Sequence, residues 1–143
     1  MKDSHVVYLI DTNILVYAYD SSDPEKQKIA RALLEKCWKR NVTYAISSQN
    51  LAEFFVVMTQ KVANPLPLEH AEQIIKDIIS FPQWKVLNYT ETTLQSAIQS
   101  YKKTKKHFWD AMISTTMIQN GISHIYTENI NDFRIFSPIT AVN

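Results

Sequence analysis

Apolar and polar residues follow one another along this chain in blocks that predict strands and helices in turn. The run from Val6 to Ile10 is continuously apolar and stops at Asp11, which is typical of a strand buried on both faces of a parallel sheet. Further short strands are predicted at Thr43–Ile46, Trp84–Leu87 and His124–Thr127, with a last edge strand at Ile139–Val142. The segment Ile14–Tyr19 is apolar and fits a strand or a helix on propensity alone.

Between these strands, apolar residues recur at the three- and four-residue spacing of amphipathic helices. Ser22-Asp23-Pro24-Glu25 predicts a helix start, because it offers a capping Asp, a proline in the first turn and an acid at the positive end of the helix dipole. Ser47 or Ser48 can cap another helix, and Asn120-Gly121 is a helix end signal. The apolar faces of the predicted helices lie within Ile29–Trp38, Leu51–Val62, Ala71–Ile79, Leu94–Tyr101 and Phe108–Gln119.

This alternation predicts one α/β domain over residues 1–143, a three-layer sandwich with a mainly parallel central sheet flanked by helices. The 143 residues are 45% hydrophobic and 20% charged, which are the proportions of a single globular domain. No apolar stretch reaches the length of a membrane span and no leader-like start is present, so we expect a cytoplasmic protein without a membrane partner.

The amino-acid composition excludes several kinds of binding site. The single cysteine, Cys37, excludes an internal disulfide and a CxxC metal site, and the single glycine, Gly121, excludes glycine-rich phosphate loops. The four histidines show neither HxH nor HxxxH spacing, so no zinc site is predicted. A net charge of +1 provides no strong overall attraction for nucleic acid.

Four acidic residues stand where they could converge. Asp11 and Asp132 follow predicted strands, Glu53 lies on a predicted helix and Asp110 lies in the first turn of another. In parallel sheets, ligands bind just beyond the carboxyl ends of the strands. Because helices run antiparallel to the strands, we expect a helix N-terminus to lie at the opposite edge unless a long connection precedes it. The sequence therefore permits these acids to converge without requiring it.

Converging carboxylates would repel one another and raise one another's pKa values, and a divalent cation would remove that cost. Ligands that are all oxygen suit Mg²⁺ or Mn²⁺ rather than zinc. Such a metal can activate a water molecule and stabilise charge on a phosphodiester during in-line displacement. If the acids converge, metal-dependent hydrolysis of a phosphodiester bond is therefore a chemistry that they can support.

Each of these residues also has a purely structural interpretation. Asp11 could have no role beyond capping the segment that follows it, and Glu53 could simply be solvated. Asp110 could lie in a first helical turn only because the helix dipole favours an acid there. Asn13 is either a second cap or a hydrogen-bonding partner of Asp11. The aromatic residues that could stack bases are more typical of a core; they are Tyr17, Tyr19, Phe108 and Trp109.

Four lysines precede Asp110 and are candidates to hold RNA phosphates: Lys102, Lys103, Lys105 and Lys106. Contacts of this kind give affinity and salt dependence rather than sequence choice. The alternative is that they form a solvated helix end.

Four segments together resemble a PIN-domain ribonuclease, most closely the toxin of VapBC-type toxin–antitoxin pairs. They are Tyr8–Leu15 (YLIDTNIL), Ser47–Phe54 (SSQNLAEF), Phe108–Ile113 (FWDAMI) and Tyr126–Phe133 (YTENINDF). Their order and spacing span nearly the whole chain.

The resemblance implies a metal-dependent endoribonuclease whose Mg²⁺ or Mn²⁺ is held by Asp11, Glu53 and Asp110, with a fourth acid after the last central strand. It also implies products with a 3′-hydroxyl and a 5′-phosphate, a homodimer, and silencing by a cognate antitoxin. The apolar helices around Val56-Val57-Met58 and Ile74-Ile75 are candidate partner surfaces, although core packing explains most of those residues.

The fourth acidic position is where this chain departs from many proteins that it resembles. Many of those proteins carry Asp two residues after the Thr that corresponds to Thr127, and this chain has Asn129 there. Other proteins that it resembles have Asn at that position and Asp three residues later, which matches Asp132. We favour Asp132, with Thr12, Asn13, Thr127 and Asn129 as polar supports. An amide oxygen is neutral and a poorer cation ligand than a carboxylate.

Other functions fit the sequence less well. A receiver domain needs an Asp at a central strand end and a late Lys, but the middle strands end at Ser47 and Asn88, and Glu128 follows Thr127. A haloacid-dehalogenase-type phosphatase needs Asp-x-Asp, and Asn13 replaces the second acid. A catalytically degenerate PIN scaffold, which binds RNA or a protein partner without cleavage, is the alternative that Asn129 keeps open.

Overall fold

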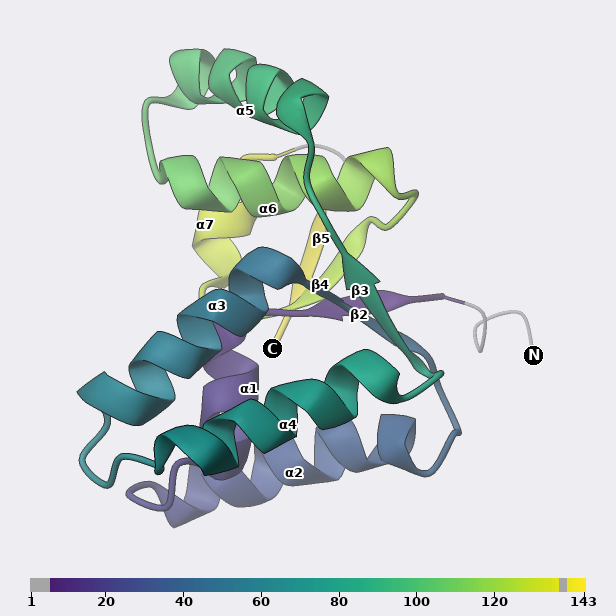
Figure 1. The fold of residues 1–143 in the computed structure, drawn as a ribbon. Helices are drawn as coiled ribbons and strands as arrows, with labels where there is room; N and C mark the ends of the chain where they lie inside the picture. Colours follow the sequence, from purple (N-terminus) through teal and green to yellow (C-terminus); the bar gives the residue numbers. More distant parts are fainter. Residues whose placement is uncertain (1–5, 137–138) are drawn as a thin grey trace.

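A parallel five-stranded sheet forms the middle layer of the computed structural model, which describes residues 6–136 and 139–143 (Figure 1). The strands are β1 (Tyr8–Ile10), β2 (Tyr44–Ser47), β3 (Trp84–Leu87), β4 (His124–Tyr126) and β5 (Thr140–Val142). Their order is β3-β2-β1-β4-β5, and all four pairings are parallel. The predicted α/β sandwich is confirmed, with β1 in the centre and β5 at an edge.

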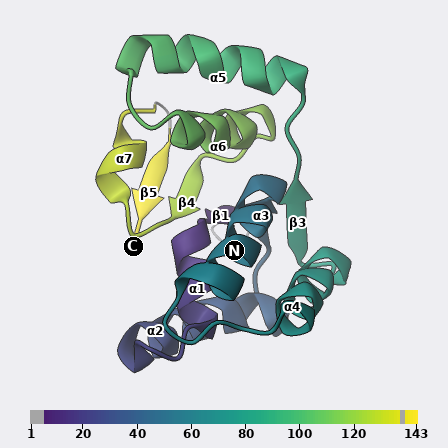
Figure 2. The same cartoon turned by 60° about the vertical axis from the view of Figure 1, so that its left-hand side comes forward.

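Helices cover both faces of this sheet (Figures 1 and 2). One face carries α1 (Thr12–Tyr19), α2 (Pro24–Trp38), α3 (Ser48–Val56) and α4 (Leu68–Ser80); the other carries α5 (Glu91–Thr104), α6 (Phe108–Gln119) and α7 (Ile130–Arg134). A π-helical turn, Val57–Lys61, continues α3. Among the described residues, no helix combines the length and the apolar character that a bilayer crossing requires.

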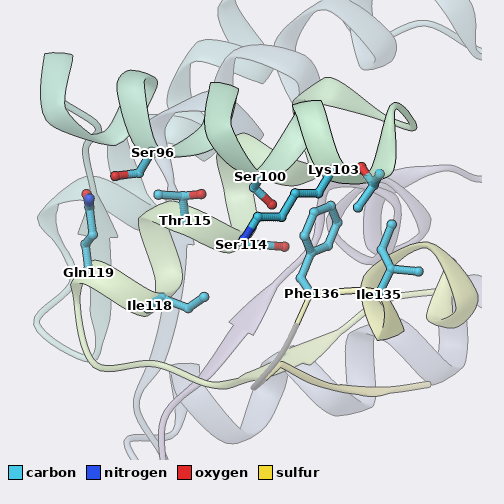
Figure 3. Close-up of a pocket in the computed structure, with 10 residues that line it drawn as sticks. Ser96, Ser100, Lys103, Ser114, Thr115, Ile118, Gln119, Ile135 and Phe136 are labelled. Carbon is cyan, nitrogen blue, oxygen red and sulfur yellow. The ribbon is translucent and has the colours of Figure 1, made fainter.

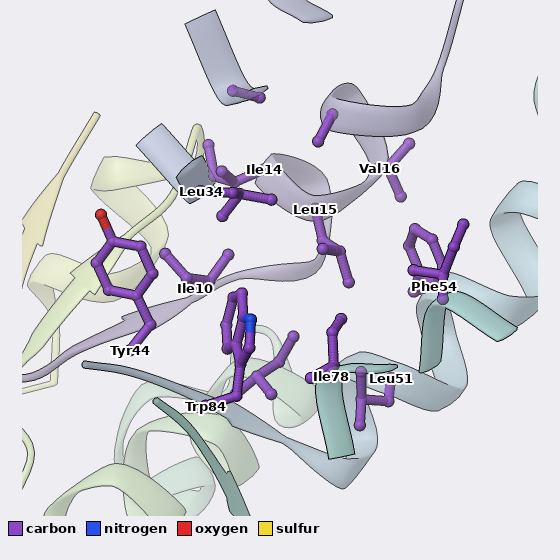
Figure 4. Close-up of a cluster of buried hydrophobic side chains, with 14 of the residues drawn as sticks. Ile10, Ile14, Leu15, Val16, Leu34, Tyr44, Leu51, Phe54, Ile78 and Trp84 are labelled. Carbon is purple, nitrogen blue, oxygen red and sulfur yellow. The ribbon is translucent and has the colours of Figure 1, made fainter. Parts of the chain in front are cut away.

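Successive residues of the central strand point into two separate cores, as the two-residue period of a strand requires. Ile10 packs with residues of α1 to α4, whereas Leu9 packs with residues of α5 to α7. Figure 4 shows the first core, where Ile10 lies beside Trp84 and Leu15 lies between Ile10 and Phe54. Burial on both faces explains why the strand reads as a continuous apolar run.

Local capping signals decide where several helices begin. Asp23 accepts a hydrogen bond from the Lys26 amide, so α2 starts where the sequence predicted. Ser47 and Asn50 form a reciprocal capping box at the start of α3. The ambiguous segment Ile14–Tyr19 is helical, because Asp11 caps it by accepting a hydrogen bond from the Thr12 amide at 2.9 Å.

Three sequence expectations are wrong or incomplete. Ile29 is 71% exposed and lies off the buried face of α2. Met58 and Ile74, which were candidate partner surfaces, are buried in the core, whereas Val56 is exposed. The helix α7 was not predicted; it is only five residues long, too short for a periodic pattern to mark it.

The expectation about helix N-termini is also wrong. A helix that directly follows a parallel strand begins at the edge where that strand ends, and only its C-terminus lies at the opposite edge. Thus α1 begins after β1, and α3 begins after β2, on the same edge of the sheet. The helix α5 lies between β3 and α6 in the chain and packs on α6, so α6 also begins at the edge of the sheet where the strands end (Figures 1 and 2).

Candidate metal centre

Asp11 lies at the carboxyl end of the central strand, and its side chain is held in place by three donors. Its Oδ1 accepts hydrogen bonds from the Thr12 amide at 2.9 Å and from Asn50 Nδ2 at 3.3 Å, and its Oδ2 accepts one from Thr127 Oγ1 at 2.7 Å. The residue is only 6% exposed. Burial raises the pKa of the Asp11 carboxyl, although these hydrogen bonds oppose the rise.

Glu53 is joined to Asp11 through a short network on α1 and α3. Thr12 Oγ1 donates to Glu53 Oε1 at 2.8 Å and accepts from Asn50 Nδ2 at 2.9 Å. The Asn50 side chain is fully buried, and its Oδ1 accepts from Ser47 at the start of α3. The capping box of α3 therefore also positions the two acids, a role of Asn50 that the sequence analysis missed.

Asp110 reaches the same region from the first turn of α6. Its side chain is 22% exposed. Burial first, and then the negative charges of Asp11 and Asp132, raise the pKa of Asp110 from 3.8 to about 6. Asp11, Glu53 and Asp110 together line one cavity of about 360 Å³, which Thr12, Asn13 and Asn129 also line.

Asp132, on α7, lies on the far side of Asp110 and next to a histidine. Asp132 Oδ1 is 3.4 Å from His107 Nε2, and Asp110 Oδ2 is 4.0 Å from His107 Nδ1. One ligand atom from each of these three residues falls within 4.8 Å of the others, which is close enough for a shared cation. His107 was not singled out from the sequence; its position three residues before Asp110 at a helix start was the available signal.

Hydrogen bonds of Thr127, Asn129 and Asn13 join the loop after β4 to the start of α1. Besides donating to Asp11, Thr127 Oγ1 accepts from the Asn129 amide at 2.9 Å. Asn13 Oδ1 accepts from the Glu128 amide at 3.3 Å. Asn13 is therefore a loop anchor; in the part of the chain that the structure describes, the hydrogen bonds to the Asp11 carboxylate come from Thr12, Asn50 and Thr127 instead.

A charged cluster that the sequence analysis missed borders the cavity. Tyr17, which lines the cavity, donates a hydrogen bond to Glu128, and Lys26 forms an ion pair with the same carboxylate at 2.9 Å. These two partners lower the pKa of Glu128, the Tyr17 hydrogen bond contributing most. Glu128 is thus occupied by its own partners and does not add a free charge to the acids.

The four candidate lysines are exposed at the end of α5 and in the loop before α6, and none of them lines the acidic cavity. Lys103 instead lines a separate cavity between α5, α6 and the Phe136 region, beside Ser114 (Figure 3). The contact of these four lysines with RNA phosphates stays a prediction.

The donor set fits a hard divalent cation. Within residues 6–136 and 139–143, no Lys or Arg forms an ion pair with Asp11, Glu53, Asp110 or Asp132. Burial is the main reason that the pKa values of Asp11 and Asp110 are raised, and the charges of neighbouring acids add to the rise. A bound cation would offset both costs. Oxygen ligands of this kind suit Mg²⁺ or Mn²⁺.

Comparison with known proteins gives matches along nearly the whole chain. The family model described as PIN domain matches residues 8–136. Ribonuclease VapC24 of Mycobacterium tuberculosis is 25% identical over 142 residues, covering 92% of this chain and 97% of that protein.

Solved structures show the same fold at lower identity. VapBC2 from Rickettsia felis, bound to a DNA fragment from its promoter, superimposes with a TM-score of 0.68 at 19% identity, covering 96% of this chain and 98% of that one. VapC20 of Mycobacterium tuberculosis, a toxin that cleaves the sarcin-ricin loop, gives a TM-score of 0.65 at 17% identity, with coverage of 90% and 92%.

Proposed function

This chain belongs to the PIN-domain family, and we propose that it is a metal-dependent endoribonuclease. The observation that carries the proposal is the cavity lined by the carboxylates of Asp11, Glu53 and Asp110. They come from the cap of α1, from α3 and from the first turn of α6, and no Lys or Arg of the described chain forms an ion pair with them. The similarity to a protein named as a ribonuclease supports the same activity.

We propose that Asp11, Glu53 and Asp110 hold Mg²⁺ or Mn²⁺, with Asp132 as the fourth acid. The metal, when bound, would activate water and neutralise charge on the phosphodiester. The protein's own part is positioning. Asn50, Thr12 and Thr127 hold Asp11 and Glu53 through hydrogen bonds, so the carboxylates are oriented before any ion binds.

We further propose the biological setting that the family resemblance suggests. The protein acts on cytoplasmic RNA as the toxin of a toxin–antitoxin pair, forms a homodimer, and is silenced by a cognate antitoxin. Copurification of a small partner protein with this chain from cells that produce both, and release of activity when the partner is removed, would test this setting separately from the chemistry.

The activity itself is tested by incubating antitoxin-free protein with a mixture of structured cellular RNA in Mg²⁺ or Mn²⁺. We expect cleavage by the wild type, and its loss with EDTA and in the Asp11→Asn variant, which keeps the size of the side chain but removes its charge. A Glu35→Gln variant, which alters an exposed acid on α2 far from the site in sequence, is the matched control and should cleave normally. Intact RNA in every metal-loaded sample would favour the non-cleaving scaffold instead.

A further inference from the structure

A second cavity, which we call the aromatic cavity, shares Glu53 with the acidic one. It measures about 490 Å³ and is lined by Ser48, Gln49, Ala52 and Glu53 of α3, by Tyr89 and by Trp109. This volume lies within the range of roughly 300–1,000 Å³ that small ligands occupy. Because Glu53 lines both cavities, whatever enters the aromatic cavity lies beside the candidate metal centre.

Two aromatic side chains in this cavity are exposed rather than packed in the core. Trp109 is 57% exposed and Tyr89 is 47% exposed, although the sequence analysis regarded Trp109 as more typical of a core. Trp109 is nonetheless held in place. Its carbonyl oxygen accepts a hydrogen bond from Gln49 Nε2 at 3.3 Å, and its ring packs edge-on to Phe108 with centroids 5.3 Å apart.

The chemistry of the lining favours a neutral, flat ligand. Among residues 6–136 and 139–143, Glu53 is the only charged residue that lines the aromatic cavity, and no Lys or Arg lines it to bind a phosphate. The aromatic faces offer stacking, while the Ser48 hydroxyl and the Gln49 amide offer hydrogen bonds to the edge of a ring. These are the features of a site for a nucleobase, whose phosphate can lie at the neighbouring acids and their metal.

We propose that Trp109 and Tyr89 stack an unpaired RNA base in the aromatic cavity, adjacent to the phosphodiester held at the acids. The base must be unpaired, because a paired base hides its faces within the helical stack. This proposal rests on the proposed nuclease function, since it assigns the bound nucleotide to that same site.

Binding is measured apart from cleavage by titrating the Asp11→Asn protein with a single-stranded 12-nucleotide RNA of mixed sequence in Mg²⁺. Of the three tryptophans, Trp84 is buried, Trp38 is half-buried and only Trp109 is exposed, so stacking should quench Trp109 fluorescence. We expect quenching by the single strand and little by the same RNA in a duplex. Adding Trp109→Leu should abolish the quenching. Measured by the fluorescence anisotropy of end-labelled RNA, binding should weaken by about 10-fold in Trp109→Leu, whereas Trp109→Phe should retain most of the affinity.

Cleavage by otherwise wild-type protein provides the second measurement. Trp109→Leu should raise KM by about 10-fold with little change in kcat, because stacking stabilises bound RNA before and during reaction alike. Ile29→Ala removes another exposed apolar side chain, on α2 and outside the cavity, and should change neither constant.

The outcomes separate this proposal from the nuclease function. Normal cleavage with unchanged binding and KM in Trp109→Leu would overturn the stacking site and leave the nuclease intact. Quenching by single-stranded RNA without cleavage by the wild type would uphold the stacking site and overturn the nuclease. If RNA neither binds nor quenches, and Trp109→Leu instead weakens binding to a copurified protein, the cavity is a protein-docking site and this proposal is wrong.

Discussion

Asp11 shows how one buried residue combines a structural and a chemical role. Its carboxylate caps α1, yet the same side chain lines the acidic cavity and accepts hydrogen bonds from two further elements. The alternatives of helix cap and site residue are therefore compatible at this position. The hydrogen bonds from Thr127 and Asn50 oppose the effect of burial on its pKa and so keep the carboxylate available to a cation.

Thr127→Val tests the importance of this support. The change removes the hydroxyl that donates to Asp11 at 2.7 Å and keeps the shape of a fully buried side chain. We expect the pKa of Asp11 to rise further and Mn²⁺ affinity, measured by calorimetry, to fall by about 10-fold. Thr116→Val is the matched control, because it removes a buried threonine bond to the Met112 carbonyl on α6. Equal Mn²⁺ affinities in the two variants would contradict the role given to Thr127.

Asp110 makes the metal-free protein sensitive to pH. Its pKa is raised from 3.8 to about 6, so the folded state favours the protonated form. The stability contributed by this group is therefore present below about pH 4 and is lost as the pH rises through 6, the opposite of a salt-bridged carboxylate. The full effect corresponds to up to about 3 kcal/mol.

Asp110→Asn should remove this sensitivity. In EDTA at pH 7.5 we expect the variant to resist urea unfolding better than the wild type, with the advantage shrinking toward pH 4.5. Adding Mn²⁺ should reverse the order at pH 7.5, because only the wild type gains a ligand-stabilised folded state. A stability difference that does not change with pH would show that Asp110 has an ordinary pKa.

At the scale of elements, the short helix α7 carries Asp132, which we propose as the fourth acid. Asp132 lies in its first turn beside His107 and contributes to the raised pKa of Asp110, whereas Asn129 precedes the helix and lines the acidic cavity itself. The two candidates for the fourth position therefore relate to the site differently. The charge of Asp132 acts on Asp110, whereas Asn129 lines the cavity directly.

Comparing Asp132→Asn with Asn129→Ala decides between them. We expect Asp132→Asn to weaken Mn²⁺ binding by about 10-fold, because it removes a charge near the cation, and Asn129→Ala to have a smaller effect. Both are measured by calorimetric titration at pH 7.5. A larger loss in Asn129→Ala would assign the fourth position to the amide and leave the site with three acids.

Some helices and strands of this fold can be predicted from the sequence, and others cannot. The helix beginning at Pro24 carries strong capping signals, and the strand Trp84–Leu87 was predicted with its observed bounds. Ile14–Tyr19 was ambiguous because β-branched and aromatic residues fit both a strand and a buried helix; the cap at Asp11 decided in favour of the helix. Only the spatial packing shows that Ile29 faces solvent.

At the scale of the whole molecule, the parallel sheet gathers acids that are far apart in the chain. The sequence predicted the fold and the acidic candidates, because apolar periodicity and motif spacing are local signals. Periodicity alone could not predict that the acids converge, since convergence follows from the order of the strands and from where the helices start. Only the family resemblance implied it. The contributions of Asn50 and His107 and the exposure of Trp109 also depend on contacts between distant segments.

The most direct test of the account is the chemistry of the RNA ends that purified protein produces in Mn²⁺. Hydrolysis by an activated water predicts a 5′-phosphate on one fragment and a 3′-hydroxyl on the other, and cleavage that persists when the nucleotide 5′ to the cut lacks its 2′-hydroxyl. Fragments that end in a 2′,3′-cyclic phosphate, or cleavage that survives EDTA, would contradict a reaction in which the acids act through a bound metal.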